Sequence, residues 1–182
     1  MNKHLITRLR GHRWGWPAPF LILLFMVAGA APAGATLYFV NDASTNGDVY
    51  CTNVGSDGNP GTNAAAPKLT MTNLFASVTL LPGDIVYIDT GGYSNYTVNV
   101  PASGTAGNLI TFQGSTNYGS GGTVFRQNNS ASNVFSLAGR SYISLRDLTV
   151  RDGQCGVYMT GSFCDFYRVA AIRNARGFWS QS

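Results

Sequence analysis

Apolar and polar residues alternate along the last forty or so residues of the chain, and the pattern repeats with a period of 21 residues. Alternation with a period of two predicts β-strands that bury one face. The equivalent pairs are Ile143 and Cys164, Leu145 and Phe166, Leu148 and Val169, Val150 and Ala171, Gly156 and Gly177, and Val157 and Phe178. Because so short a repeat cannot bury its apolar face alone, the pattern predicts units that stack as a solenoid.

Short strands separated by Gly, Asn and Ser turns also account for most of the chain before this repeat. A first strand is expected at residues 36–40. The apolar spacing of residues 68–81 predicts a short amphipathic helix, with Thr70 or Thr72 as its N-cap and Pro82 after its end. Further strands are expected at residues 84–89, 96–100, 108–113, 122–125, 133–137, 142–145, 148–150, 156–159, in two halves within 163–172, and at 177–179.

These elements predict an all-β fold with one helix, either a β-sandwich or stacked parallel coils. A sandwich gives no reason for Gly156-Val157-Tyr158 to recur in phase as Gly177-Phe178-Trp179. One coil of a three-faced parallel β-helix needs roughly this many residues, and its neighbouring strands would lie about 4.8 Å apart. Glycines are expected at its corners, where φ must be positive. The sequence therefore favours a parallel β-helix.

Residues 1–35 are expected to be a secretory signal peptide rather than part of the fold. Four basic residues precede an unbroken apolar stretch at residues 20–27, and Ala33-Gly34-Ala35 is a typical cleavage signal. The alternative is an uncleaved membrane anchor, but the apolar stretch is shorter than the about 20 residues that a span needs. The mature chain would begin near Thr36.

Removal of the leader changes the charge of the chain. The sequence has 12 Lys and Arg against 8 Asp and Glu, but four of the basic residues and none of the acidic ones lie in residues 1–35. The mature part therefore has eight charges of each sign, which argues against a nucleic-acid partner. The leader predicts a secreted or cell-surface protein with no stable membrane span after cleavage, and the form of the cleavage site suggests a bacterial source.

The mature part contains no His and no Glu, because His4 and His12 both lie in the leader. Ser-His-Asp and Cys-His catalysis, His-ligated zinc and a Glu acid or base are thereby excluded. The odd number of cysteines, Cys51, Cys155 and Cys164, leaves at least one thiol unpaired within the chain. Cys164 is expected to be a small core residue, and a Cys155–Cys164 disulfide is the alternative in an exported protein.

Several segments of the N-terminal half match a known pattern. They are GSDGNPGT at residues 55–62, Ala66-Pro67, PGDIVYI at residues 82–88, Gly92-Tyr93 and TAGNLITFQG at residues 105–114. The first two segments lie between the first strand and the short helix, and the others follow the helix and lead into the first coils. In this order they resemble the start of secreted right-handed parallel β-helix proteins of the pectate-lyase-like superfamily. Leu109 departs from that pattern, which has Pro there. The motifs are specific to the architecture rather than to one activity.

The resemblance implies a protein that acts on or binds polysaccharide, in the first place a relative of polysaccharide lyases. Such lyases use a Lys or Arg base, together with acidic side chains that bind Ca²⁺ beside a uronate carboxylate. Here no acidic cluster recurs at the coil period and Lys68 lies in the cap region, so no catalytic residue can be transferred. A non-catalytic surface or adhesion solenoid is the alternative, supported by the acid-poor composition rich in Asn, Ser, Thr and Gly.

Members of this superfamily generally have more coils and a C-terminal cap. After the leader, this chain divides into an N-terminal cap with the first coils at residues 36–107 and about three further coils at residues 108–182. It ends within the strand-like segment Gly177–Trp179. We therefore expect a truncated solenoid that lacks catalytic coils and whose exposed last coil allows self-association.

Two pairs of outward residues recur at the coil period. Tyr158 and Trp179 are expected to stack outside the coil and could bind the apolar faces of sugar rings, although packing at a corner is the alternative. Asp147 and Arg168 are expected to form an ion pair between coils that contributes about 0–1 kcal/mol, although an Arg base is the alternative.

The first loop concentrates oxygen ligands at Asp42, Asn46, Asp48 and Asp57. Such ligands make Ca²⁺ the candidate cofactor of this loop. Their spacing matches no known calcium loop, and turn formation by Asx side chains is the alternative explanation.

Overall fold

The structure is a computed structural model that describes residues 34–181, so the expected leader lies almost wholly outside the described part. The elements are β1 (Leu37–Val40), α1 (Met71–Ser77), β2 (Ile85–Ile88), β3 (Gly91–Ser94), β4 (Val98–Asn99), β5 (Ile110–Gly114), the 3₁₀-helix η1 (Tyr118–Ser120), β6 (Thr123–Asn129), β7 (Phe135–Leu137), β8 (Ile143–Gly153), β9 (Cys155–Met159), β10 (Asp165–Ile172) and β11 (Arg176–Ser180). Among residues 34–181, no helix is long and apolar enough to cross a membrane.

The pairing of the last strands follows the repeat seen in the sequence. The register joins Phe166 to Leu145, Val169 to Leu148, Ala171 to Val150 and Phe178 to Val157. These pairs are parallel and each joins residues 21 positions apart, so the predicted stacking of β10 on β8 and of β11 on β9 is confirmed. Every other pairing between named strands is parallel as well, which does not fit an antiparallel sandwich.

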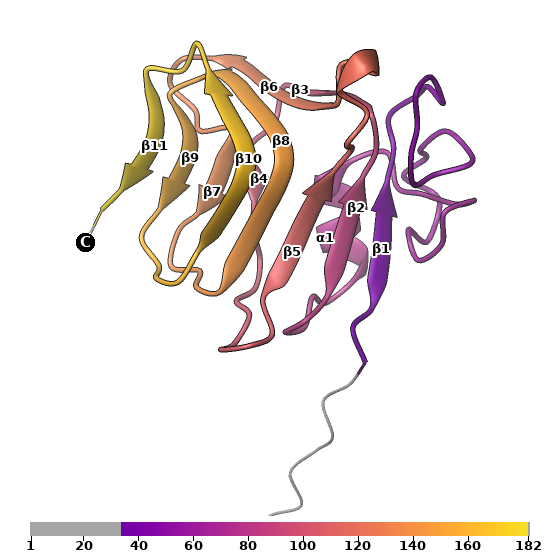
Figure 1. Ribbon diagram of the computed structural model, residues 1–182, viewed down its shortest axis with the longest axis horizontal. Helices are drawn as coiled ribbons and strands as arrows, with labels where there is room; N and C mark the ends of the chain where they lie inside the picture. The colour runs from indigo at the N-terminus through magenta and orange to yellow at the C-terminus, as the bar shows by residue number, and fades with distance from the viewer. Residues whose placement is uncertain (1–33, 182) are drawn as a thin grey trace, which may run out of the picture. The chain divides into compact units, whose positions relative to one another are not determined.

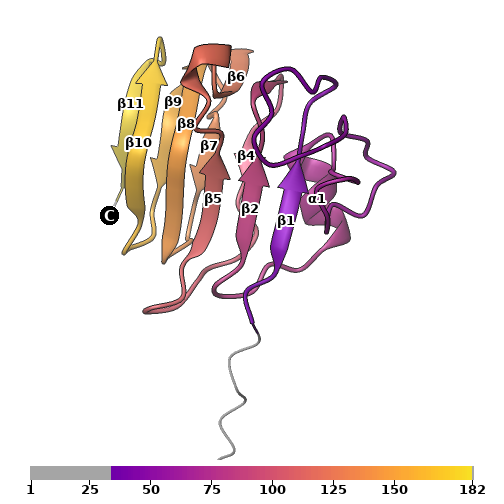
Figure 2. The same ribbon diagram turned by 45° about the vertical axis from the view of Figure 1, so that its right-hand side comes forward.

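The strands form three stacks, whose outer surfaces we call face 1, face 2 and face 3. Face 1 consists of β1, β2, β5 and the first parts of β8 and β10, which lie side by side at the front of Figure 1. Face 2 consists of β3, β6 and the second parts of β8 and β10. Face 3 consists of β4, β7, β9 and β11. The chain contributes a strand to each face in turn, and each further turn of the chain adds one strand to every stack. This arrangement is consistent with a β-helix-like solenoid (Figure 2).

The corners of the last coils are made by residues other than glycine. The left-handed corner residues are Tyr142 and Phe163 before face 1 (φ 58° in both), Asp147 and Arg168 between faces 1 and 2 (φ 55° and 53°), and Asp152 and Arg173 between faces 2 and 3 (φ 61° and 54°). This conformation costs about 1–2 kcal/mol for an L-residue. Side-chain contacts that glycine cannot make offset this cost, because each corner residue contacts the equivalent residue of the next coil. The rings of Tyr142 and Phe163 stack with centroids 4.9 Å apart, and the two other corners form the ion pairs Asp147–Arg168 and Asp152–Arg173. The expectation of glycine corners was wrong here; Gly156 and Gly177 lie within β9 and β11.

The inward residues of the three stacks form a continuous apolar core. β5 shows the alternation most clearly, because Ile110 and Phe112 are fully buried while Thr111 and Gln113 face outward. The rings of Phe112 and Phe125 both pack edge to face on Phe135, with centroids 6.2 and 5.0 Å away. The three faces therefore share one core, and the outward residues are free to differ between faces.

Helix α1 packs on this core next to β4 and is shorter than expected. Thr70 is its N-cap, as predicted, and its side chain accepts a hydrogen bond from the backbone N–H of Asn73. The helix ends at Ser77, since Val78 is extended (φ −133°, ψ 154°) and allows Leu80 to reach the core outside the helix. The Asp84 carboxylate then accepts the backbone N–H of Leu81 at 2.7 Å and fixes the turn into β2.

Two further expectations need correction. Residues 143–150 form part of one strand, β8, rather than two, because the strand continues around the corner at Asp147. Residues 91–100 form two strands on different faces, because the left-handed Asn95 separates β3 from β4.

The last coil is less buried than the coils before it. β10 and β11 consist mainly of exposed residues, and Phe178 is 46% exposed. Cys164 packs against the core from this coil as a free thiol, and the buried Cys51 and Cys155 are free as well. The Cys155–Cys164 disulfide considered as an alternative is therefore not formed.

Candidate functional site

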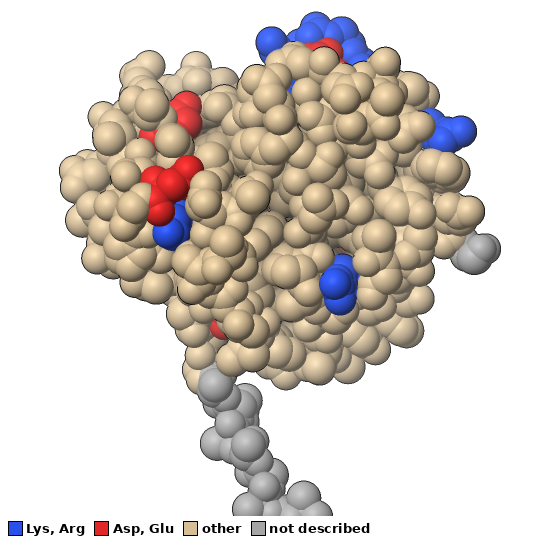
Figure 3. Space-filling model, turned by 180° about the vertical axis from the view of Figure 1, so that it is seen from behind, with Lys and Arg blue, Asp and Glu red and all other residues tan. Residues whose placement is uncertain are grey.

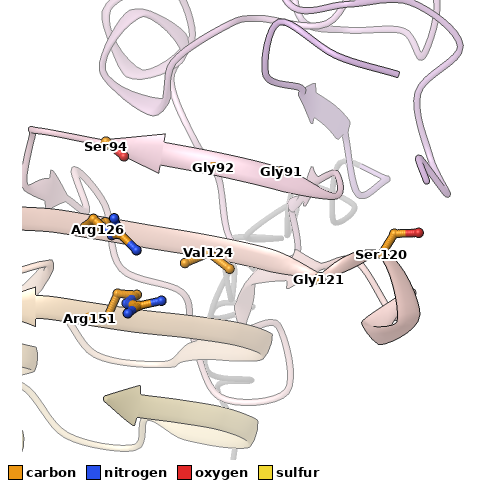
Figure 4. Close-up of a pocket in the computed structure, with 9 residues that line it drawn as sticks. Gly91, Gly92, Ser94, Ser120, Gly121, Val124, Arg126 and Arg151 are labelled. Carbon is orange, nitrogen blue, oxygen red and sulfur yellow. The ribbon is translucent and has the colours of Figure 1, made fainter. Parts of the chain in front are cut away.

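A groove of about 390 Å³ crosses face 2 (Figure 4). It is lined by Gly91, Gly92 and Ser94 of β3, by residues 120–122 ahead of β6, by Val124 and Arg126 of β6, and by Arg151 of β8. Small residues keep most of the groove open, and two guanidinium groups lie together at one end of it. Gly91 has to be small, because a Cβ there would lie 2.2 Å from Oδ2 of Asp42.

Three arginines share a single carboxylate at the basic end of this groove. Arg126 and Arg151 are partners in the register of β6 and β8, and their Nε atoms lie 3.1 and 3.0 Å from Oδ2 of Asp152. Arg173 reaches the same carboxylate from the next corner, with Nε 2.8 Å from Oδ1 and Nη2 2.9 Å from Oδ2. The side chains of Arg126 and Arg173 remain 41% and 60% exposed, so both can also contact a ligand.

The charges of this corner do not balance. Three guanidinium groups face one carboxylate, which leaves two positive charges uncompensated. At the β3 end, the carboxylate of Asp42 accepts backbone N–H groups of Ser44 and Gly92 at 2.8 and 3.0 Å. The side of the molecule opposite face 1 carries few charged side chains (Figure 3). The arginine end of the face 2 groove is therefore a local site of positive potential that would attract anionic groups.

The segment between β5 and β6 forms the rim of the groove, and hydrogen bonds fix its position. The backbone N–H of Ser115 donates to Oγ1 of Thr123 at 2.7 Å, and the hydroxyls of Ser115 and Thr90 lie 2.6 Å apart. Asn117 Nδ2 donates to the carbonyl of Gly47 at 2.9 Å, which ties the rim to the first loop. The rim therefore separates the face 2 groove from the outer surface of face 1.

On the face 1 side of the rim, Asp147 is a buried carboxylate with several donors. Arg168 Nε lies 2.6 Å from its Oδ1, Gln113 Nε2 donates to its Oδ2 at 2.7 Å, and the Tyr118 hydroxyl donates to Oδ1. Burial raises the pKa of Asp147, but the hydrogen bonds from Tyr118, Gln113 and Arg168 outweigh burial and hold the pKa below its ordinary value. The hydrogen bond to Asp147 raises the pKa of both Tyr118 and Arg168. The expected Asp147–Arg168 ion pair is thus confirmed, and Arg168 is poorly suited to act as a base.

All eight carboxylates of the described chain already have partners. Asp42, Asp48, Asp57, Asp84 and Asp89 bind polar groups of the N-terminal region, and Asp147, Asp152 and Asp165 bind arginines. Glycoside hydrolysis commonly requires two carboxyl groups that flank the scissile bond. Lys68 donates to the carbonyl of Asp57 at 2.9 Å and serves the cap. Each of these carboxylates and Lys68 therefore has a structural contact within residues 34–181.

The three acidic residues expected to bind Ca²⁺ serve different parts of the first loop. Asp42 holds the start of β3, and Asp57 accepts the backbone N–H of Thr70 at 3.0 Å. Asp48 accepts Nδ2 of Asn41 at 2.6 Å, while its Oδ1 is buried without a hydrogen bond. Burial raises the pKa of Asp48 to about 6. No group of three acidic, His or Cys side chains suited to a metal occurs in residues 34–181, and Ca²⁺ remains an untested prediction.

Tyr158 and Trp179 are partners in the register of β9 and β11 on face 3, as expected. Their rings are tilted by 54° with centroids 5.4 Å apart, and both side chains are half-buried. The guanidinium of Arg176 lies 3.9 Å from the centroid of Trp179, so it covers part of the indole. The pair could still present one aromatic edge to a sugar ring, and its role in binding remains a prediction.

Sequence reasoning missed two functional features of this region. The first is Asp89, a fully buried carboxylate that accepts the backbone N–H groups of Val49, Tyr50 and Cys51 at 2.6–2.8 Å and so anchors the first loop. The second is the arginine site of the face 2 groove. Its sequence signal is an Arg directly after each of two predicted strands, at residues 122–125 and 148–150, but Arg126 and Arg151 are 25 residues apart and fall outside the period of 21.

No protein-family model matches the sequence, and a search of curated proteins finds no match either. Among solved structures, the chain is similar to a GH136 lacto-N-biosidase from Eubacterium ramulus, with a TM-score of 0.53 and 15% sequence identity. The similarity covers 75% of this chain and 26% of the lacto-N-biosidase chain. At this identity the comparison concerns the fold, and this chain spans about a quarter of that enzyme.

Proposed function

We propose that the described part of the chain binds an acidic polysaccharide in the face 2 groove, as part of an exported right-handed parallel β-helix related to the pectate-lyase-like superfamily. The observation that carries the proposal is the arginine site, where Arg126, Arg151 and Arg173 share only Asp152. Guanidinium groups bind carboxylate or sulfate in a planar, two-pronged geometry, so a polymer with such groups would gain charge-assisted hydrogen bonds there.

Two further observations favour carbohydrate as the partner. The groove is open along face 2 and crosses neighbouring strands, which suits an extended chain better than a small enclosed ligand. The structural neighbour is by its name a glycosidase, which fits a fold used on sugars. A solenoid that stacks similar coils also presents the long, regular surface that polymer binding uses.

For the whole protein, a polysaccharide lyase is the first candidate activity and a non-catalytic surface or adhesion solenoid is the second. One observation favours the non-catalytic role for residues 34–181. Each of their carboxylates has a hydrogen-bond or ion-pair partner within the chain, and Arg168 is bound to Asp147. Secretion to the bacterial cell surface and a structural Ca²⁺ in the first loop are part of the proposal on sequence grounds alone.

The test is calorimetric titration of the full chain with polygalacturonate at low and high salt. Replacing Arg126→Gln together with Arg151→Gln should weaken binding by roughly tenfold or more, because two charge-assisted contacts are lost. The matched control replaces Arg140→Gln and Arg176→Gln, which removes the same charge elsewhere and should change affinity little. Equal loss in both double variants would mean that net charge alone drives binding and would refute the site. Release of unsaturated uronate, followed by absorbance, distinguishes a lyase from a binding protein.

A further inference from the structure

A second set of outward residues forms a line across face 1, which we call the face 1 column. It consists of Phe39, Tyr87, Gln113, Arg146 and Tyr167, one residue from each of five neighbouring strands. Each member is the register partner of the next, so the members follow one another at the strand spacing of about 4.8 Å. The column therefore runs across the strands, along the direction in which the coils stack (Figure 1).

Aromatic rings occupy both ends of the face 1 column. At one end, the rings of Phe39 and Tyr87 stack with centroids 5.7 Å apart, and Tyr50 lies 4.6 Å from Tyr87. At the other end, Tyr167 is 49% exposed, and Arg168 lies 4.5 Å from its ring centroid. Within residues 34–181, the hydroxyls of Tyr87 and Tyr167 make no hydrogen bond.

The polar middle of the column is held in place by its own contacts. Gln113 donates from Nε2 to the carbonyl of Gly114 and to Asp147, both at 2.7 Å. Arg146 donates to the hydroxyl of Ser144 at 2.9 Å and to Asp165 at 3.0 Å. Because these side chains are already ordered, a ligand would not have to immobilise them on binding.

The charges near the face 1 column balance, unlike those of the face 2 groove. Arg146 pairs with Asp165 at 3.0 Å and Arg168 pairs with Asp147 at 2.6 Å. The outward residues of β1, β2 and β5 on this face carry no charge. Because the charges are paired, this surface would not attract an anionic polymer. An uncharged ligand could bind here without separating an unpaired charge from water.

We propose that the face 1 column binds a linear, uncharged glycan that runs across the strands, as a second site independent of the face 2 groove. Sugar rings have an apolar face, which Tyr167 and the Phe39–Tyr87 pair can cover, and hydroxyl groups, which the two free Tyr hydroxyls and the guanidinium of Arg146 can bind. A line of aromatic groups at both ends and hydrogen-bonding groups in the middle, at constant spacing, matches an extended polymer better than a globular protein surface.

The experiment titrates the full chain with a soluble, neutral β-1,4-linked hexasaccharide and measures affinity by calorimetry. Tyr167→Ala should weaken binding by roughly three- to tenfold, because one stacking surface is lost, whereas Tyr167→Phe should retain most of the affinity. Phe163→Ala is the matched control, because Phe163 is an aromatic residue of the same coil that is 70% exposed but lies outside the column. A cooperative thermal transition in each variant, above the temperature of the titration, would establish that all remain folded.

Three outcomes would overturn the proposal. The first is no binding of the hexasaccharide at millimolar concentration, or binding that Tyr167→Ala leaves unchanged. The second is loss of binding in Trp179→Ala instead, which would assign the site to face 3. The third is a dimer that Tyr167→Ala dissociates without any glycan binding. Polygalacturonate affinity, measured on the same variants, should not change, so failure of the face 1 site and failure of the face 2 site are distinguishable.

Discussion

Faces 1 and 2 are built from the same coils and share one core, yet their outer surfaces have opposite character. β8 and β10 contribute to both faces and bend between them at Asp147 and Arg168. On face 1, each arginine near the column has a carboxylate of its own. On face 2, three arginines share Asp152. The ratio of arginines to carboxylates distinguishes the two surfaces: two to two on face 1 and three to one on face 2.

The comparison shows how a stacked fold can separate stability from recognition. Inward residues have to repeat from coil to coil because they pack on one another, whereas outward residues face solvent and can change independently. The two corner carboxylates illustrate the difference. The side chain of Asp147 is 2% exposed and is enclosed by its donors, whereas that of Asp152 is 19% exposed and lies beside the groove.

The largest effect is expected from Asp147→Asn. Asparagine tolerates the left-handed backbone of this corner, so the change tests the charge rather than the turn. Tyr118, Gln113 and Arg168 would lose the buried charged acceptor that they share, and we expect the free energy of unfolding to fall by about 2 kcal/mol. Urea denaturation at pH 7 measures this loss.

The matched control is Asp152→Asn at the equivalent corner of face 2. The Asp152 side chain is 19% exposed against 2% for that of Asp147, so the loss should stay below about 1 kcal/mol. A loss as large as that of Asp147→Asn would mean that the two corners do not differ in the way described here.

The second prediction concerns pH and the loop that places Tyr50 on face 1. The pKa of Asp48 is raised from 3.8 to about 6, so the folded state binds more protons than the unfolded state between these values. Its contribution to stability is therefore most favourable at the acidic end and is lost as pH rises through 6. Asp48→Asn should stabilise the protein by about 1 kcal/mol at pH 8 and by little below pH 4.

Thermal unfolding of the wild type and Asp48→Asn across pH 4–8 provides the measurement. The difference between the two proteins isolates Asp48 from the other carboxylates. A difference that is constant with pH would show that Asp48 does not titrate in this range.

The parts of the fold that could be predicted from the sequence are those in which successive coils have the same length. Asp147 and Arg168 are 21 residues apart, so a periodic alignment finds their pairing, and the same holds for Tyr158 and Trp179. The cap helix was also predictable, because Thr70 supplies a capping hydroxyl at its start. Its end was not, since nothing local in the sequence shows that Leu80 reaches the core in an extended conformation.

The binding surfaces could not be predicted because loops of variable length separate their members. Arg126 and Arg151 face each other across 25 residues, and Phe39 and Tyr87 across 48. Only the strand register brings such residues together. The charge balance was equally hidden, because it depends on which arginines reach Asp152 rather than on composition.

The third prediction increases the contrast between the faces. Asp152→Asn removes the carboxylate shared by the arginines, so the face 2 groove should bind polygalacturonate roughly threefold more tightly at low salt. The gain should disappear near 1 M salt, where charges are screened within about 3 Å. Affinity for a neutral hexasaccharide should be unchanged. Weaker binding of polygalacturonate would show that Asp152 mainly orients the arginines and that their order matters more than their excess charge.

The smallest effect is expected from Tyr118→Phe, which removes one donor from Asp147 and leaves the ring in place. Asp147 has a pKa below its ordinary value in the folded state, so its contribution to stability is present at neutral pH and is lost as pH falls through that lowered pKa. Without the Tyr118 hydroxyl the pKa of Asp147 should rise, and the free energy of unfolding at pH 7 should fall by about 0.5 kcal/mol. Following thermal unfolding from pH 7 downwards tests the cause, because the difference from wild type should shrink as Asp147 becomes protonated. A loss that does not depend on pH would instead assign the role of Tyr118 to packing of its ring against Arg168, whose guanidinium lies 5.9 Å from the ring centroid.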